Sequence, residues 1–409
     1  MVAQDADVRL RPSWLLLGPA FVAAIAYVDP GNVAANVSAG AQFGFLLVWV
    51  IVVANIMACL VQYLSAKLGL VSGQSLPEAV GGRMRRPTRL GYWMQAELVA
   101  MATDLAEVVG GAIALYLLFD LPLLTGGVIT GAVSLLLLVI KDRRGQQMFE
   151  RVITGLLLVI AIGFCTSLFV AAPPASEAAA GLVPMFAGTE SVLLAAAMLG
   201  ATVMPHAVYL HSGLTRDRHG HPDPGPMRRM LLRATRWDVG IAMVVAGAVN
   251  LSMLLVAATN LQGRDNTDSI EGAHAAVNDT LGPTVALLFA IGLLASGLAS
   301  SSVGAYAGQM IMQGLLHVSI PMVARRLITL VPALVILAVG VDPSRALVLS
   351  QVVLSFGIPF ALIPLVRLTS DRAVMGDDTN HRVTTALGWL VAALITVLNV
   401  VLIYLTIKG

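Results

Sequence analysis

Hydrophobic residues form long, almost uninterrupted stretches along this chain, and polar residues gather in short segments between them. A helix that crosses a membrane needs roughly 20 consecutive, mainly apolar residues. Eleven segments meet this requirement, and the ninth is the shortest of them. The pattern therefore predicts an all-α integral membrane protein with eleven spans, near residues 14–37, 44–68, 91–119, 121–140, 151–171, 190–213, 237–260, 284–316, 326–341, 345–366 and 383–407.

The composition agrees with this pattern. Of the 409 residues, 57% are hydrophobic and only 12% are charged, and the mean hydropathy is +0.85. Soluble domains carry about 25% charged residues. We expect a single transmembrane domain over 1–409, with no appended soluble domain, and the longest connections to be solvated loops at 215–236 and 262–282.

Basic residues sort onto alternate connections. Only Arg264, Arg345 and Lys408 of the 25 Lys and Arg fall on the side opposite to the rest. Because basic residues remain preferentially on the cytoplasmic side, the N-terminus is expected to be cytoplasmic. An odd number of spans then places the C-terminus outside a multi-pass protein of the cell (inner) membrane.

The first span contains Asp29-Pro30-Gly31-Asn32, flanked by apolar residues on both sides. A carboxylate at membrane depth is costly and usually marks an ion or substrate pathway. Proline lacks an N–H and glycine favours irregular backbone, so a regular helix is not expected to continue here. The segment predicts either a loop between two half-buried helices or a transmembrane helix broken in mid-bilayer, and we favour the broken helix.

A second break is expected in the sixth span, within Gly200-Ala201-Thr202-Val203-Met204-Pro205-His206. Broken helices at matching positions of two halves indicate an inverted-repeat transporter with a midplane site. Spans 1–5 (about 14–171) and 6–10 (about 190–366) would be the repeats. Since five is odd, the second repeat would be inverted, and the helix at about 383–407 would be an addition.

The two breaks together offer a mixed set of metal ligands. Asp29 supplies a carboxylate, Asn32 an amide oxygen, Met204 a thioether, and the backbone of Ala201 a freed carbonyl. Hard Mg²⁺ and Ca²⁺ prefer all-oxygen shells, whereas a thioether favours softer transition metals. A methionine in a span is more often only a core residue, but the position of Met204 before Pro205 and opposite an intramembrane aspartate favours a ligand for Mn²⁺ or Fe²⁺, with Co²⁺ and Cd²⁺ also tolerated.

Asp29-Pro30-Gly31-Asn32 and Met204-Pro205-His206 resemble the paired motifs of the Nramp family of proton-coupled divalent metal transporters, above all its bacterial manganese transporters. The segments 102–107, 204–212, 306–309 and 351–359 are also similar to family segments. The resemblance implies a LeuT-like fold and metal ligation by Asp29, Asn32, Met204 and the Ala201 carbonyl, with Gln351 joining in some states. One departure is Gly297-Leu298-Ala299-Ser300, where many relatives have Gly-Gln-Ser-Ser.

The third span carries Glu97, Asp104 and Glu107, which fall within about 80° of one another on a helix. Three acids on one face inside a membrane suggest a proton relay, although a water-lined or ion-paired structural face is the alternative. Arg325 and Arg326 are candidate partners for these acids or plain positive-inside anchors.

His206 and His211 follow the second break and can pass protons near neutral pH. For His211 a structural role is an open alternative. The resemblance supports a proton-moving role for His206, Asp104 and Glu107.

These observations predict a secondary transporter that imports Mn²⁺, and also Fe²⁺, with protons moving inward. Asp29 would be both metal ligand and proton acceptor. The metal is a substrate, and no cofactor or nucleic-acid partner is expected. The alternatives are a Na⁺-coupled amino-acid transporter of the same fold, which Asp29 disfavours by repelling a carboxylate, and an ion channel. An enzyme is not expected, because the intramembrane acids lack a nucleophile–base arrangement.

Overall fold

The computed structural model describes residues 18–264, 269–318 and 320–408. Within these ranges the protein is built from helices, without strands. They are α1 (Pro19–Ile25), η2 (Ala26–Val28), α2 (Pro30–Phe43), η3 (Gly44–Leu47), α3 (Val48–Ser72), α4 (Leu76–Gly81), α5 (Arg86–Phe119), α6 (Leu123–Arg144), α7 (Gln146–Val170), α8 (Ala175–Ala180), α9 (Gly188–Thr202), α10 (Pro205–His219), α11 (Pro226–Asn260), α12 (Ile270–Leu281), α13 (Pro283–Leu316), α14 (Met322–Val339), α15 (Pro343–Ser370), α16 (Arg372–Met375), η4 (Gly376–Asp378) and α17 (Arg382–Lys408).

Within the described residues, each predicted span coincides with a helix or with a pair of half-helices, and residues 14–17 of the first span lie outside the described part of the chain. In the described part of the chain, nine helical stretches are long and apolar enough to cross a membrane. That number is below eleven because α2 and α3 form one stretch, Pro30–Ser72, so that spans 1 and 2 count once, and because α14 falls outside the set; α1 with η2 is a shorter apolar helix that forms the first half of span 1. Span 1 is split into α1 with η2 and α2, and span 6 into α9 and α10.

Two connections expected to be loops are largely helical, and those expectations were wrong. Within 215–236, α10 continues to His219 and α11 begins at Pro226. Within 262–282, the described residues include α12, whose first turn is capped by Ser269 accepting from the Gly272 N–H at 3.0 Å. Hydropathy finds the apolar part of a helix, whereas α10 and α11 continue into polar sequence beyond it and α12 is a separate short helix.

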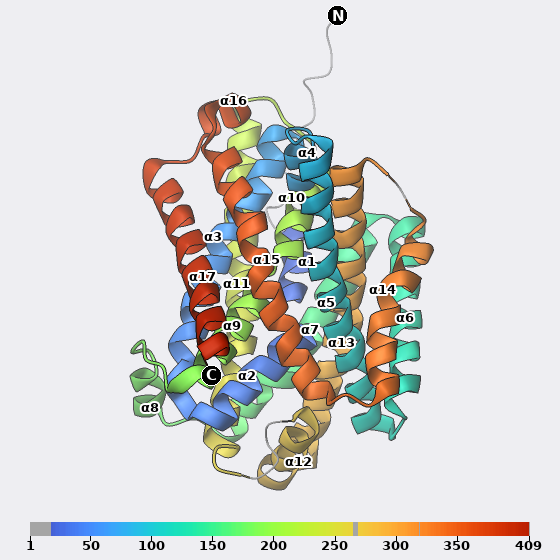
Figure 1. Ribbon diagram of the computed structural model, residues 1–409, viewed down its shortest axis with the longest axis vertical. Helices are drawn as coiled ribbons and strands as arrows, with labels where there is room; N and C mark the ends of the chain where they lie inside the picture. The colour runs from blue at the N-terminus through green and yellow to red at the C-terminus, as the bar shows by residue number, and fades with distance from the viewer. Residues whose placement is uncertain (1–17, 265–268, 319, 409) are drawn as a thin grey trace, which may run out of the picture.

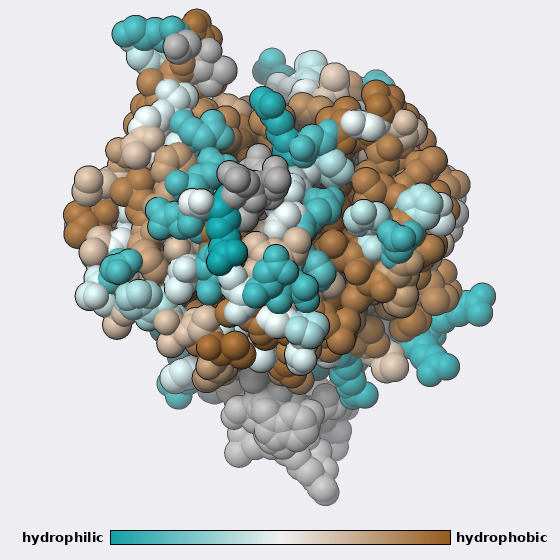
Figure 2. All heavy atoms as spheres, turned by 90° about the horizontal axis from the view of Figure 1, so that it is seen from below, coloured by the Kyte–Doolittle hydropathy of each residue, from teal (hydrophilic) through white to brown (hydrophobic). Residues whose placement is uncertain are grey.

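The broken helices lie inside the molecule (Figure 1). Both α2 and α9 pack against α15, and α10 packs against α3 and α13. α6 and α14 lie side by side at one edge and α17 at the other. The short helices α4 and α16 lie at one end of the bundle, and α8 and α12 at the opposite end. Seen from the α8–α12 end, hydrophilic residues gather near the centre and hydrophobic residues dominate the flanks, as expected for sides that face lipid (Figure 2).

Candidate metal-binding site at the two helix breaks

The first break is centred on Asp29, whose backbone is extended (φ −70°, ψ 169°) between η2 and α2. Pro30 occupies the first position of α2, where its missing N–H leaves no intrahelical bond unmade. The Asp29 side chain caps the new helix, because Oδ1 accepts the Asn32 backbone N–H at 2.8 Å. The sequence therefore both ends one half-helix and starts the next at the same carboxylate.

The second break comprises Val203 and Met204, between α9 and α10. Val203 has φ −106° and ψ 59°, Met204 has φ −63° and ψ 120°, and α10 begins at Pro205. The last carbonyls of a helix lack intrahelical partners. The Ala201 carbonyl is one of these groups, and it lies at the end of α9 that carries a partial negative charge.

One side chain joins the two breaks. Asn32 Nδ2 donates to Asp29 Oδ1 at 2.8 Å and to the Ala201 carbonyl oxygen at 3.0 Å. Asp29, Asn32 and Ala201 are all fully buried. Residues that are 169 positions apart in the chain are thus brought together, as the sequence predicted for three of the five proposed ligands.

Gln351 and Met204 complete the set. Gln351 on α15 lies directly over the backbone of Gly31, where a Cβ would fall 1.8 Å from Gln351 Nε2, so a larger residue at 31 would displace the Gln351 side chain. Gln351 Nε2 also donates to Ser350 Oγ at 3.1 Å. Met204 is fully buried within the second break itself. Each of the five residues is therefore at a break or against one.

Three buried oxygen atoms of this group have no hydrogen-bond donor: Asp29 Oδ2, Asn32 Oδ1 and Gln351 Oε1. Buried acceptors without partners are costly and uncommon in folded proteins. A cation among them would supply the missing partner. Within the described residues no group of three or more His, Cys, Asp or Glu side chains could hold a metal, so a site here depends on one carboxylate and neutral donors.

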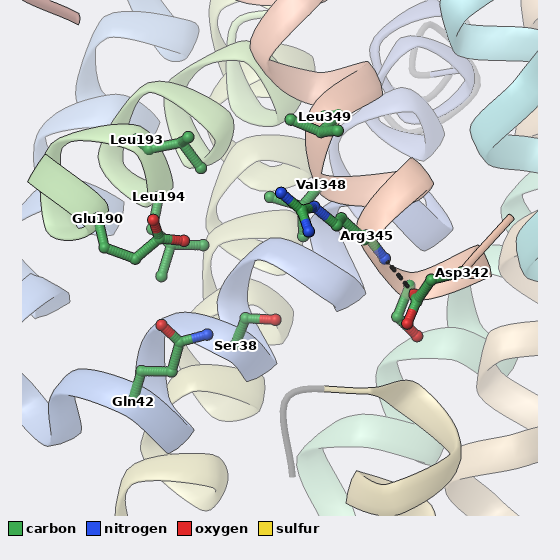
Figure 3. A pocket seen from close by; sticks show the side chains of 10 residues that line it. Ser38, Gln42, Glu190, Leu193, Leu194, Asp342, Arg345, Val348 and Leu349 are labelled. Carbon is green, nitrogen blue, oxygen red and sulfur yellow. Dashed lines mark hydrogen bonds between the residues drawn. The ribbon is translucent and has the colours of Figure 1, made fainter. Parts of the chain in front are cut away.

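A cavity of about 380 Å³ opens between α2, α9 and α15, the helices that carry Asn32, Ala201 and Gln351 (Figure 3). It lies toward the end of the molecule that carries α8 and α12. Ser38 and Gln42 of α2 face Glu190 of α9 and Arg345 of α15. Asp342, the residue that caps α15, also lines the cavity, and its Oδ1 accepts the Arg345 backbone N–H at 2.8 Å. Asn32, Ala201 and Gln351 lie further along these helices. The arrangement suits a water-filled approach to the site from one side.

Toward the other end, a polar network covers the first break. His211 Nδ1 lies 2.6 Å from Gln62 Oε1, and Gln62 Nε2 donates to the Tyr27 hydroxyl. All three residues are buried. His211 was predicted from the sequence, whereas Tyr27 and Gln62 were not, although a glutamine inside the second span is a signal of the same kind as Asn32.

The structure pairs the third-span acids with the predicted arginines. Arg325 donates from Nη2 to Glu97 Oε1 at 3.0 Å, and Arg326 from Nη1 to Asp104 Oδ1 at 2.5 Å. Arg326 is buried and also donates to Ser134 and Ser301. The expected pairing is confirmed for Glu97 and Asp104, and the two arginines therefore form ion pairs inside the protein instead of serving only as positive charges at the membrane surface.

Glu107 is fully buried and differs from its two neighbours, since neither of its carboxylate oxygens has a hydrogen-bond partner. It lies one turn before Gly110, where a Cβ would fall 2.0 Å from Pro30 Cβ. Asp29 and Asp104 are both near enough to act electrostatically on Glu107. Glu107 therefore stands between the metal-binding group and the ion-paired acids.

The two histidines point to different neighbours. His206 Nδ1 lies 3.3 Å from Thr103 Oγ1 on α5, beside Asp104, and its Nε2 has no partner. His211 contacts Gln62 on α3. The sequence grouped these residues as one pathway, whereas the structure brings only His206 to the acids of α5.

Two further residues, missed by sequence reasoning, hold the freed backbone of the first break. Asn250 Nδ2 donates to the Tyr27 carbonyl at 2.8 Å, and Ser296 Oγ to the Val28 carbonyl at 2.6 Å. Asn250 Oδ1 in turn accepts from Asn36 Nδ2 at 3.0 Å. With these carbonyls occupied, the first break presents side-chain oxygens to the site.

Together the fold and site define a helical membrane protein of the LeuT-like class, in which two broken helices meet at a buried polar site. Comparison with known proteins agrees. The structure aligns over 95% of this chain and 97% of the other with MhsT in complex with L-phenylalanine, at a TM-score of 0.58 and 13% identity, which is a likeness of fold.

The family is shown by closer matches. Residues 20–405 match the family model "Natural resistance-associated macrophage protein-like" (Nramp), and the chain belongs to this family. It is 74% identical over 408 residues to the divalent metal cation transporter MntH of Mycobacterium tuberculosis strain H37Rv, covering 100% of this chain and 95% of that one. A crystal structure of the Eremococcus coleocola manganese transporter has 31% identity and a TM-score of 0.85, covering 98% of this chain and 88% of that one.

Proposed function

We propose that this protein is a divalent metal cation transporter that imports Mn²⁺, and also Fe²⁺, together with protons by alternating access. The observation that carries the proposal is the group of three unpartnered oxygens around Asp29 at the junction of two broken helices. Support also comes from relatives that are named as a divalent metal cation transporter and a manganese transporter. In this proposal the ligands are Asp29, Asn32, the Ala201 carbonyl, Met204 and Gln351.

The cargo follows from the donor set. One carboxylate, two amide oxygens and a carbonyl suit a divalent cation, and the Met204 sulfur favours transition metals over Ca²⁺ and Mg²⁺. Asp29 carries the only charge in the set, so binding depends on its ionised form. The same carboxylate disfavours a substrate that presents its own carboxylate, as an amino acid would.

Access from one side at a time is supported by the asymmetry around the site. The cavity beside Glu190 and Asp342 approaches the site from the α8–α12 end, while Tyr27, Gln62 and His211 close the other end. In this proposal the structure represents the outward-facing side of the cycle, and the network at Tyr27 must open to release metal inward.

Protons are proposed to leave Asp29 through Glu107 toward Asp104 and His206, with Glu97, Arg325 and Arg326 continuing the route. Glu107 has both oxygens free and lies between the two groups. Arg325 and Arg326 lie beside Glu97 and Asp104 and stabilise negative charge on these two acids while protons exchange along α5. His211 belongs to the closing network in this proposal.

Reconstituted protein tests the function directly. We expect saturable Mn²⁺ uptake into proteoliposomes that is faster at acidic than at neutral external pH and is accompanied by acidification of the interior. Excess Mg²⁺ should compete poorly. Uptake that does not saturate would indicate a channel, and Na⁺-driven amino-acid uptake without metal transport would indicate the alternative transporter.

Orientation is a separate part of the proposal. The helices α4 and α16, next to most of the arginine-rich connections, share one end of the bundle, and we propose that this end is cytoplasmic. Cysteine introduced at Gly409 should react with impermeant reagent from outside intact cells, whereas cysteine at Gln4 should be protected. The opposite labelling pattern would reverse the orientation.

A further inference from the structure

Helix α15, which carries Gln351, contains two prolines in its interior, Pro359 and Pro364. A proline inside a helix has no N–H to donate to the carbonyl four residues earlier. The carbonyls of Ser355 and Phe360 therefore lose their intrahelical partners. In a membrane such groups must find donors elsewhere.

Both carbonyls accept hydrogen bonds from side chains on other helices. Asn399 of α17 donates from Nδ2 to the Ser355 carbonyl at 2.8 Å, and the Tyr209 hydroxyl of α10 donates to the Phe360 carbonyl at 3.4 Å. Asn399 is buried, and its Oδ1 lies 2.7 Å from Ser355 Oγ. Because a carbonyl can only accept, the orientation of the Asn399 amide is fixed.

Asn399 bonds to the turn of α15 that contains Ser355, one turn after Gln351. This turn packs closely against both halves of span 6, α9 and α10. A Cβ on Gly200, near the end of α9, would fall 2.0 Å from the Gln351 carbonyl oxygen. A Cβ on Gly357 would fall 3.2 Å from Pro205 Cγ, at the start of α10. A shift of this turn would thus move Gln351 relative to Gly31 and to the second break.

α17 reaches this turn across an apolar layer that it shares with α9. Leu402 packs with Val192 and Ala196, and Val352 and Phe356 of α15 lie against the same cluster. The Asn399–Ser355 pair adds hydrogen bonds beside this apolar cluster, and a second polar contact between α15 and α17, Ser370 Oγ to Thr385 Oγ1 at 2.9 Å, lies at the other end of the two helices. A buried asparagine is not needed for packing there, since a leucine of similar size would serve.

We propose that Asn399 is a positioning residue: it replaces the hydrogen bond that Pro359 removes from α15, and so fixes Gln351 in its place at the metal site. The helix expected from the sequence to be an addition to the two repeats is, in this inference, part of the binding machinery. The inference rests on the proposed function in one respect, namely that Gln351 is a metal ligand.

An ordinary contact between helices would lower stability when removed, whatever residue stands at 359 or 351. A positioning role makes two different demands. The loss of Asn399 should matter less when residue 359 regains an N–H, because Ser355 then has an intrahelical donor. It should also add nothing to the loss of Gln351, because it acts through that side chain.

The experiment measures Mn²⁺ affinity by isothermal titration, and the thermal unfolding midpoint, on purified full-length protein. The variants are Asn399→Ala, Pro359→Ala and Gln351→Ala, with the doubles Pro359→Ala/Asn399→Ala and Gln351→Ala/Asn399→Ala. Thr396→Val is the matched control, because Thr396 lies one turn away on α17 and its hydroxyl bonds only to the Ala392 carbonyl of its own helix.

Asn399→Ala is expected to weaken Mn²⁺ binding about fivefold, the size of one interhelical hydrogen bond in a membrane protein. In the Pro359→Ala and Gln351→Ala backgrounds the further loss should be less than about twofold, and Thr396→Val should bind as wild type. Equal losses in all backgrounds, or no loss in the wild-type background, would overturn the inference.

Two outcomes separate this inference from the proposed function. If the wild type binds Mn²⁺ but Gln351→Ala binds as tightly, Gln351 is not a ligand and the positioning role fails with it, while transport by the remaining ligands stands. If the wild type does not bind Mn²⁺, the proposed function fails, and the unfolding midpoints still decide whether Asn399 serves the Pro359 turn. Should Asn399→Ala fail to fold, Pro359→Ala/Asn399→Ala must recover folded protein, or the inference is wrong.

Discussion

The acids of α5 and the single acid at the helix breaks have opposite kinds of partner in this molecule. On α5, Glu97 and Asp104 are ion-paired with Arg325 and Arg326 at 3.0 and 2.5 Å. At the helix breaks, Asp29 is held by hydrogen bonds from Asn32, and within the described residues no basic side chain pairs with it.

The difference favours different roles for Asp29 and for the acids of α5. A buried charge is tolerated only when it is paired, neutralised or bound to a metal. The α5 acids have protein cations and need none from solution, so they suit proton exchange within a fixed charge pattern. Asp29 lacks a partner of its own, so its countercharge must arrive as a proton or a metal ion. Glu107 is intermediate, being without an arginine of its own but near Asp104.

The strongest way to break this comparison is to remove the unpaired charge. Asp29→Asn keeps the shape of the side chain but removes the only charged ligand, so Mn²⁺ affinity and uptake should fall by roughly 100-fold or more, about 3 kcal/mol. Titration and proteoliposome uptake measure this. Asp120→Asn is the control, because Asp120 is exposed at the end of α5 with φ 53°, which asparagine also tolerates. Wild-type uptake by Asp29→Asn would refute the site.

The second test concerns the neutral donor that sets selectivity. Met204→Ala should retain part of the Mn²⁺ transport, weaken Cd²⁺ by about tenfold, and allow Ca²⁺ or Mg²⁺ to compete, since water can take the place of sulfur. Competition assays with each metal give the answer. Met198→Ala, a fully buried methionine in the middle of α9, is the control, which should lose stability without changing metal preference. Unchanged preference in Met204→Ala would exclude the sulfur as the filter.

The third test addresses the paired group. Asp104→Asn and Glu107→Gln should each change Mn²⁺ affinity by less than about threefold, because neither is a proposed ligand, but should lower the number of protons moved per metal. Simultaneous measurement of metal and proton flux in liposomes separates the two effects. A tenfold loss of affinity with an unchanged proton-to-metal ratio would instead place these acids in the metal site.

The same two variants should differ in stability. Asp104→Asn leaves Arg326 buried without its carboxylate, which costs about 3 kcal/mol when one partner of a buried pair is removed. Glu107→Gln removes an acid with no arginine of its own and should leave the unfolding midpoint nearly unchanged or higher. Equal midpoints for the two variants would mean that the arginine pairing does not compensate the α5 charge.

The smallest effect is expected at the most accessible acid. Glu97 is 17% exposed in its side chain, against 3% for Asp104. A partly hydrated ion pair contributes little, about 1 kcal/mol or less. Glu97→Gln should therefore alter the proton-to-metal ratio by less than about twofold, measured in the same flux assay. If Glu97→Gln changed the proton-to-metal ratio more than Asp104→Asn does, the proposed direction of the proton route along α5 would be reversed.

The sequence predicted the helix breaks because their signal is local: an aspartate followed by Pro-Gly, and a methionine followed by proline, inside apolar stretches. It also predicted the arginine partners, since buried acids require cations. Tyr27, Asn250 and Ser296 were missed, because their roles depend on which carbonyls the breaks leave free and which helices face them. Such contacts join residues up to 268 positions apart and have no local pattern.

Helix ends were predicted less well for a related reason. Hydropathy marks where a segment is apolar, whereas α11 begins eleven residues before its expected start, at Pro226 rather than near 237, on a polar sequence. Likewise the prolines of α15 did not break that helix, because Asn399 and Tyr209 supply the donors it lacks.

The single carboxylate at the junction also has an electrical consequence. A divalent cation held by Asp29 and neutral donors leaves the loaded site with one net positive charge inside the membrane. Moving one elementary charge across the full field yields about 2.3 kcal/mol per 100 mV. A cell interior that is electrically negative would thus draw the loaded site inward, and a second acidic ligand would have cancelled that force.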